Sequence, residues 1–305
     1  MAKQNGIKTN GRLDTAMLEK AFKVTQGRKF NLSDFQTDNL LDTQLQKSMA
    51  PALLDAELDR LRVLQEKLYA QDRWSLLLIF QAMDAAGKDS TIKHVMSGVN
   101  PQGCHVASFK QPTSNELDHN YMWRTNRQMP ARGKIGIFNR SYYEEVLVVR
   151  VHPEILTYQK LPDALVTPKI WQERLTDIAS FERYWARNGT VVRKFFLNVS
   201  KDEQKERFLK RLDDPRKHWK FSSKDVEERQ YWDDYQRAYE AAIKATASRH
   251  APWYVIPADR KWFMRLVVMA VIIETLESLD LHYPEVATAE ESQFAAMRQR
   301  LMEGA

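Results

Sequence analysis

The stretch Leu77-Leu-Ile-Phe-Gln-Ala-Met-Asp-Ala-Ala-Gly-Lys-Asp-Ser-Thr-Ile-Lys93 decides the fold of this chain. It starts as an apolar run typical of a buried strand, continues as a loop of small residues, and ends as the start of a helix. A loop whose backbone N–H groups turn inward at a helix N-terminus binds anions. Ala85, Ala86 and Gly87 let that backbone approach a phosphate, and Lys88 supplies positive charge. The stretch therefore predicts a phosphate-binding loop.

The loop departs from the Walker A pattern G-x-x-x-x-G-K-[ST] at two positions. Ala82 stands at the first glycine position, and Asp89 stands where a magnesium-binding Ser or Thr is expected. A metal must then be held differently, and Asp84 is the expected ligand, because Mg²⁺ prefers one or two carboxylates with water and phosphate oxygens. We expect Mg²⁺, or Mn²⁺ in its place, with Asp89 and Ser90 near the phosphates. If the loop is considered alone, the alternative to phosphate binding is an ordinary helix start that happens to carry a lysine.

A second segment, Gly136-Ile-Phe-Asn-Arg-Ser-Tyr-Tyr-Glu-Glu145, again ends a short apolar strand with polar residues. Open α/β sheets bind ligands at the carboxyl ends of their strands. Asn139 stands where a phosphate-loop kinase usually carries an acidic residue, so its metal contact should be weak or through water. With a helix starting near Ser141, Arg140 and Glu144 share one face. Considered without the phosphate loop, the two residues are best interpreted as a structural ion pair. Considered together with the loop, they are best interpreted as an active-site pair, which is the interpretation we favour.

The rest of the chain alternates predicted helices and strands. Residues 1–50 are polar and irregular and are expected to form an ordered but peripheral arm. Apolar spacing predicts helices over 51–64 and 168–187, and the run 264–279 is apolar nearly all round, as in a buried helix. This alternation indicates an α/β fold with a mostly parallel sheet covered on both faces, and residues 51–305 are treated as one domain. Strands are predicted at about 75–80, 105–109, 134–138, 191–199 and 253–256.

The segment after Ser200 carries a dense group of cations. Ser200 and Glu203 have the spacing of a capping box, which predicts a helix start. The cations could simply be a solvated helix face. In a phosphate-loop kinase, however, a basic helix-loop-helix late in the chain is where a lid closes over the phosphates and excludes water. We place this lid at about 207–225, with the cations Arg207, Lys210, Arg211, Arg216, Lys217, His218 and Lys220.

Composition agrees with a protein of the cytoplasm. The single cysteine, Cys104, excludes an internal disulfide and suits a reducing compartment. The first residues lack the apolar stretch of a signal peptide. The longest apolar run, 266–273, is far shorter than the roughly 20 residues of a membrane span. A formal net charge of +6 favours a polyanionic partner.

Beyond the loop and the Phe138–Glu144 segment, the chain carries further motifs at Gln65–Tyr69, Asn100–Gly103, Trp123-Arg124, Val148–Glu154, Asp213–Ser222 and Ala251–Trp262. On these motifs the chain resembles the family-2 polyphosphate kinases, in particular the class III enzymes, which phosphorylate AMP as well as ADP. Other classes commonly carry Asn where this chain has Glu144, and this difference points to the AMP-accepting class. The resemblance covers most of the chain after about residue 55.

The resemblance implies a catalytic domain of the P-loop kinase, thymidylate-kinase-like type with a helical lid. It implies a reversible, magnesium-assisted transfer of the terminal phosphoryl group of inorganic polyphosphate to AMP and ADP. The partners would be polyphosphate and the nucleotides AMP, ADP and ATP, with no nucleic acid and no membrane. A homo-oligomer is also expected.

In phosphoryl transfer the protein mainly positions groups and spreads the charge of the equatorial oxygens. The acceptor is a phosphate oxygen that is already ionised, so no strong base is required. We expect Lys88 and the loop amides to hold a phosphate, Asp84 the magnesium, and Arg140 the moving charge, with Glu144 towards the acceptor. Arg124 and Asn139 are expected near the nucleotide. The donor chain is assigned to Arg207, Arg211, Lys217 and Lys220 of the lid, with Lys93 and Lys110 extending the track.

Two other functions fit parts of the sequence. An ATP-dependent nucleoside or nucleotide kinase shares the fold, the phosphate loop and the lid, and an assay with polyphosphate and AMP but without ATP separates the two. A nucleic-acid-binding protein could use the basic lid to follow a backbone, but the sequence lacks the interleaved aromatic residues of a single-strand platform.

Overall fold

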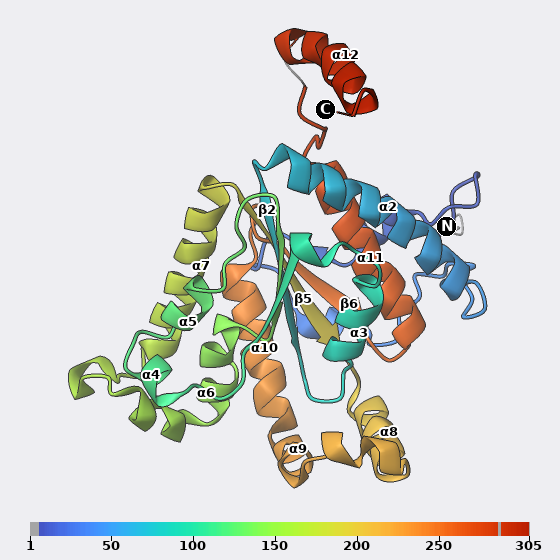
Figure 1. The fold of residues 1–305 in the computed structure, drawn as a ribbon. Coiled ribbons are helices and arrows are strands. Elements are labelled where there is room, and N and C mark those ends of the chain that lie inside the picture. The colour runs from blue at the N-terminus through green and yellow to red at the C-terminus, as the bar shows by residue number, and fades with distance from the viewer. Residues whose placement is uncertain (1–5, 286–287, 305) are drawn as a thin grey trace.

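The protein, described here from a computed structural model, is built around one six-stranded sheet. The structure describes residues 6–285 and 288–304. The strand order is β1-β6-β5-β2-β4-β3, and Figure 1 shows the sheet between two layers of helices. All neighbouring strands are parallel except β1, which runs antiparallel to β6. The strands are β1 Lys23–Val24, β2 Ser75–Ala82, β3 Cys104–Ser108, β4 Ile135–Asn139, β5 Thr190–Asn198 and β6 Trp253–Pro257.

Strand β2 lies at the centre of the sheet, with β4 as its neighbour on one side and β5 on the other. All of its residues are buried, as expected for a parallel strand covered on both faces. The five strands predicted from the sequence are confirmed with small shifts of their ends. Their carboxyl ends meet at one edge of the sheet, and the phosphate loop follows β2 at that edge.

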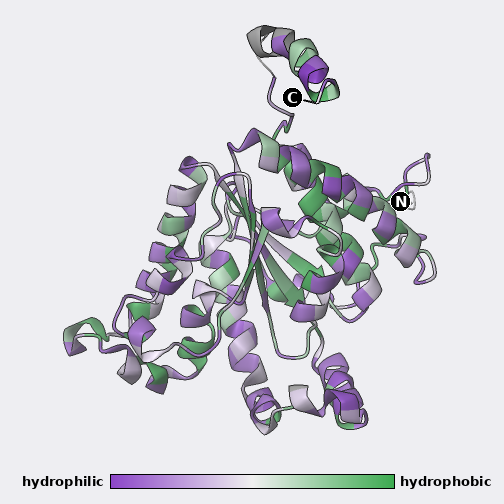
Figure 2. Cartoon of the chain, viewed as in Figure 1, coloured by the Kyte–Doolittle hydropathy of each residue, from purple (hydrophilic) through white to green (hydrophobic). Residues whose placement is uncertain are grey.

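Helices cover both faces. On one face α2 (Ala50–Gln71), α11 (Lys261–Glu277) and α3 (Lys88–Val95) pack together, and on the other α7 (Ile170–Arg187) packs against α10 (Trp232–Thr246). Nearly every residue of α11 after its first turn is buried, as its all-round apolar sequence predicts. Figure 2 shows the hydrophobic residues gathered on the strands and α11 and hydrophilic residues on the lid helix α8. Within the described ranges, none of the helices is both long and apolar enough to span a bilayer.

Residues 6–50 are ordered, as predicted, but they pack into the domain and do not form a peripheral arm. Their strand β1 extends the sheet beside β6, and α1 (Thr15–Ala21) packs against α11. Leu13, Leu18 and Phe22 belong to the main hydrophobic core. Thr37 donates a hydrogen bond to Asp259 (2.7 Å), which links this segment to the loop after β6. The burial of apolar residues along the arm makes it part of the domain.

The remaining elements differ in length. The short helices are α4 (Ser114–Leu117), α5 (Trp123–Asn126), α6 (Val148–Val151) and α9 (Ser223–Glu227), and the longer ones are α8 (Lys201–Leu212) and α12 (Thr288–Met302). Turns of 3₁₀ helix span Leu32–Asp34, Pro101–Gly103, Tyr142–Val146, Pro153–Gln159, Asp163–Leu165, Pro215–Lys220 and Glu228–Tyr231. The lid is therefore α8, the turn Pro215–Lys220 and α9.

Candidate active site

The phosphate loop turns sharply between β2 and α3. Ala85 (φ 59°) and Gly87 (φ 109°) both have left-handed backbone conformations, and Gly87 caps the first turn of α3. Such a conformation strains Ala85, whereas Gly87 adopts it without a Cβ penalty. Lys88 lies at the start of the helix, and its Nζ donates to the carbonyl of Ala82 at 2.8 Å. The lysine thus lies folded over the loop. Burial lowers the pKa of Lys88, and the nearby charge of Arg140 lowers it further.

Arg140 lies between two carboxylates at the end of β4. Its Nη2 is 3.2 Å from Asp84 Oδ1, and its Nη1 is 3.6 Å from Glu144 Oε2. The charge of Glu144 is the largest influence that raises the pKa of Arg140, and Asp84 adds to it. Arg140 has a left-handed backbone (φ 65°), and its side chain remains 41% exposed. The predicted pair of Arg140 and Glu144 is confirmed as a contact, with Asp84 as a second partner.

The helix considered near Ser141 is present as a 3₁₀ turn, Tyr142–Val146, and not as an α-helix. The side chain of Ser141 accepts a hydrogen bond from Tyr143 N and caps the turn. Below it, the hydroxyls of Tyr142 and Tyr143 both donate to buried Glu182 at 2.8 Å. This anchoring in the core holds the short turn and brings Glu144 back to Arg140.

Asn139 and Asp89 contact each other across the site. The Asn139 amide donates to Asp89 Oδ1 at 2.6 Å, which joins the end of β4 to the start of α3. Ser90, also expected near the phosphates, donates to the carbonyl of Gly87 at 3.1 Å. The residues predicted around the loop therefore do come together at the carboxyl edge of the sheet.

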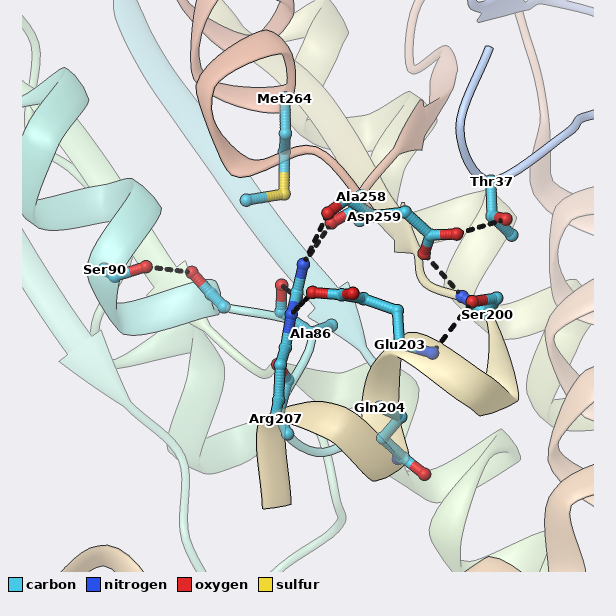
Figure 3. Close-up of polar contacts among 12 residues, drawn as sticks. Thr37, Ala86, Ser90, Ser200, Glu203, Gln204, Arg207, Ala258, Asp259 and Met264 are labelled. Atoms are coloured by element: carbon cyan, nitrogen blue, oxygen red, sulfur yellow. Dashed lines mark hydrogen bonds and ion pairs between the residues drawn. The ribbon is translucent and has the colours of Figure 1, made fainter. Parts of the chain in front are cut away.

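The structure corrects the position of Arg207, which was assigned to the donor chain. This side chain is only 5% exposed and points from α8 under the phosphate loop (Figure 3). Its Nε also pairs with Glu203 at 2.8 Å, so the guanidinium is already satisfied by the protein. The backbone carbonyls that accept from it are those of Ala86 (2.6 Å), Ala85 (3.1 Å), Ala258 (2.6 Å) and Asp259 (3.2 Å).

Neighbouring contacts fasten α8 to the same place. Gln204 donates to the carbonyl of Asp84 at 2.9 Å, which adds a second link between α8 and the loop. Only half of the predicted capping box forms: Ser200 Oγ accepts from Glu203 N, while Ser200 N donates to Asp259. The Glu203 carboxylate is occupied by Arg207 instead. Gln204 was missed from the sequence, where nothing distinguishes it from a solvent-facing glutamine.

The outer part of the lid carries cations that pair with carboxylates. Lys217 is half exposed and pairs with Asp214 at 2.8 Å. Lys220 ends the same turn, and its side chain lies outside the described part of the structure. Arg211 lies 3.7 Å from Asp225, a residue of α9 that the sequence interpretation missed. Burial and the charge of Asp84 both raise the pKa of Asp225.

On the other side of the site, Arg124 is buried and donates to the carbonyl of Lys110 at 2.8 Å. It lines a cavity of about 250 Å³ whose wall includes Tyr121, Glu145 and Arg174. A nucleotide contact by Arg124 stays a prediction. The side chains of Lys93 and Lys110 are exposed, as a donor track requires.

A metal ion fits this site only with help from the substrate. Asp84 is 30% exposed at the loop, so one carboxylate is accessible. Within the described residues, no group of three or more His, Cys, Asp and Glu side chains could hold a metal ion by itself. Mg²⁺ is usually bound by one or two carboxylates together with water and substrate phosphates. The residues present match that mode of binding.

Comparisons with known proteins agree on one family. A family model described as polyphosphate kinase 2 matches residues 44–284. The chain is 51% identical over 286 residues to the ADP-polyphosphate phosphotransferase of Rhodopseudomonas palustris, covering 93% of this chain and 98% of that protein. It is 46% identical over 272 residues to the AMP/ADP-polyphosphate phosphotransferase of Meiothermus ruber, covering 89% and 98%. The crystal structure of polyphosphate kinase 2 from Arthrobacter aurescens matches with a TM-score of 0.85 and 39% identity, covering 94% and 96%.

Proposed function

This chain belongs to the polyphosphate kinase 2 family, and we propose that it transfers the terminal phosphoryl group of inorganic polyphosphate to AMP and to ADP. The observation that carries the proposal is the position of Arg140, partly exposed beside the phosphate loop and held between Asp84 and Glu144. Two similar proteins are named for this chemistry, one with ADP and one with AMP and ADP. The expected homo-oligomer and cytoplasmic location stay predictions.

The chemistry of the step follows from charge. The acceptor phosphate attacks the terminal phosphorus of polyphosphate, the P–O bond to the shortened chain breaks, and the chain leaves as an anion. Negative charge spreads over the equatorial oxygens in the transition state, so fixed cations stabilise it more than the ground state. The Lys88 ammonium and the loop N–H groups lie at one side of the transferred group, and the Arg140 guanidinium at another. The lid excludes water that would otherwise hydrolyse the donor.

A bound Mg²⁺ would neutralise phosphate oxygens, and we infer that Asp84 holds it. Asp84→Asn is expected to raise the Mg²⁺ concentration for half-maximal rate by about tenfold and to lower kcat by about a hundredfold, because one ligand charge is lost. Magnesium titrations at fixed polyphosphate and AMP measure both effects. Asp89→Asn is the matched control, since it removes a carboxylate one residue beyond Lys88. An equal change of the magnesium requirement in both variants would contradict the assignment to Asp84.

Glu144 is proposed to set the balance between acceptors. AMP carries less negative charge than ADP, and Glu144 offsets part of the positive charge of Arg140. Glu144→Asn leaves Arg140 more positive, so kcat/KM for ADP should rise relative to that for AMP by about tenfold. Parallel steady-state assays with the two acceptors give this ratio. An equal loss with both would show that Glu144 is a structural partner of Arg140.

One assay tests the function itself. Purified protein is incubated with long-chain polyphosphate, Mg²⁺ and either AMP or ADP, and the nucleotides formed are separated and quantified. Formation of ADP from AMP, and of ATP from ADP, without any ATP added is the expected result. If transfer requires ATP as the donor, the chain is an ATP-dependent nucleotide kinase. Transfer to ADP but never to AMP would limit the proposal to the activity named for the Rhodopseudomonas palustris relative.

A further inference from the structure

Gln81 is a polar side chain in an otherwise apolar part of the central strand. It lies in β2, directly before the phosphate loop, and is 0% exposed. Its Nε2 donates to Glu144 Oε1 at 3.1 Å, and its Oε1 is buried with no hydrogen-bond partner among the described residues. A buried amide with one unpaired atom is costly compared with an apolar residue of the same size. Its contact with Glu144 is therefore the feature that needs an explanation.

The direction of this contact is fixed by chemistry and by the sheet. A carboxylate only accepts hydrogen bonds, so the amide nitrogen of Gln81 must face Glu144. Gln81 is in register with Phe196 of β5, and the preceding residue Phe80 is in register with Asn139 of β4, so this end of β2 is held from both sides. The amide is thus presented to Glu144 from a rigid position.

The Glu144 carboxylate lies within hydrogen-bond distance of Gln81 but farther from Arg140. The hydrogen bond from Gln81 is 3.1 Å, whereas the nearest oxygen to Arg140 is 3.6 Å away, longer than a charge-assisted hydrogen bond of about 2.7–2.9 Å. The carboxylate is therefore held by Gln81 and not closed onto Arg140. An arginine in a closed bidentate pair would have fewer donors for a phosphate.

We propose that Gln81 is a positioning residue that holds Glu144 away from Arg140 and so keeps the Arg140 guanidinium available for the transferred phosphoryl group. The inference rests on the proposed function. It assigns Gln81 an action through Glu144 and no contact with substrate. Without Gln81, Glu144 closes onto Arg140 and neutralises it more fully.

Gln81→Met tests this, because Met has a similar length and cannot donate. We expect kcat to fall by about tenfold, and kcat/KM to fall more for ADP than for AMP, since a more neutral Arg140 disfavours the more highly charged acceptor. This change of ratio is opposite in sign to that of Glu144→Asn. Gln81→Asn, which keeps an amide but is one methylene shorter, should shift the ratio in the same direction and serves if Gln81→Met does not fold.

A double-mutant cycle separates positioning from packing. In a Glu144→Ala background, Gln81→Met should cause no further change of the acceptor ratio, because the residue through which it acts is gone. Gln65→Met is the matched control: Gln65 is a buried glutamine of α2 that also has an unpaired amide atom. It should change thermal stability but leave the acceptor ratio at the wild-type value.

Three results would overturn the inference. The first is an unchanged acceptor ratio in folded Gln81→Met or Gln81→Asn. The second is the same ratio change in the presence and absence of Glu144, and the third is an equal change in Gln65→Met. A wild-type protein that transfers no phosphoryl group from polyphosphate would overturn the proposed function itself, and the inference with it.

Discussion

Lys88→Met is expected to lower kcat by a hundredfold or more, which corresponds to about 3 kcal/mol of transition-state stabilisation. The lysine contributes positive charge at the phosphate loop, and its ammonium donates to the Ala82 carbonyl at the end of β2, where the loop begins. Met keeps the length of the side chain and removes the charge. Steady-state kinetics with polyphosphate and AMP measure the loss.

The fold should survive this change. Burial lowers the pKa of Lys88, which means that its charged form is disfavoured in the folded state. Removing the charge therefore removes a cost of folding, and the melting temperature should stay the same or rise. Lys93→Met, on the exposed face of the same helix, is the control: a donor-track contact there would raise the KM for polyphosphate, while most of kcat should be retained. If Lys88→Met keeps more than about a tenth of wild-type activity, the phosphate-loop assignment is wrong.

Arg207→Met is expected to reduce both stability and activity. The guanidinium donates to the backbone carbonyls of Ala86 in the phosphate loop and Ala258 after β6, and both of these residues are buried. Leaving several buried acceptors and Glu203 without their partner should lower the free energy of unfolding by about 3 kcal/mol or more. Because the phosphate loop loses this support, the kcat of the variant should also fall with either acceptor. Thermal unfolding and steady-state kinetics of the same preparation measure the two effects.

Arg207→Lys should restore little, because one ammonium cannot replace a planar group that donates in several fixed directions. Arg211→Ala, one turn further along α8, is the matched control. Arg211 lies nearer the surface beside Asp225, so we expect a loss of less than about 1 kcal/mol in stability. Its loss should raise the KM for polyphosphate, most for long chains and least at high salt. If Arg207→Met instead folds normally and raises only the KM for polyphosphate, Arg207 contacts the donor after all.

The local sequence determined the five parallel strands of the sheet, the loop and the pair at the end of β4. The strands could be predicted because each is a short apolar run between turn residues, and alternation with helices implies parallel pairing. Lys88 could be found because a phosphate loop requires several residue types at fixed spacing. Arg140 and Glu144 lie four positions apart, so their contact needed only a local turn. These features depend on neighbours in the chain.

The tertiary structure decided the features that depend on distant segments. Arg207 has the composition of a surface lid cation, but its partners lie about 50 and 120 residues away, so only the fold could place it under the loop. The first fifty residues look polar on average, yet their few apolar side chains fill the core beside α11. Gln81 is visible in the sequence as a polar residue within an apolar strand, but its partner Glu144 lies on another strand's turn. The role of such a side chain depends on the groups that surround it in space. Those groups come from segments that are distant in the sequence, and local sequence patterns do not connect them.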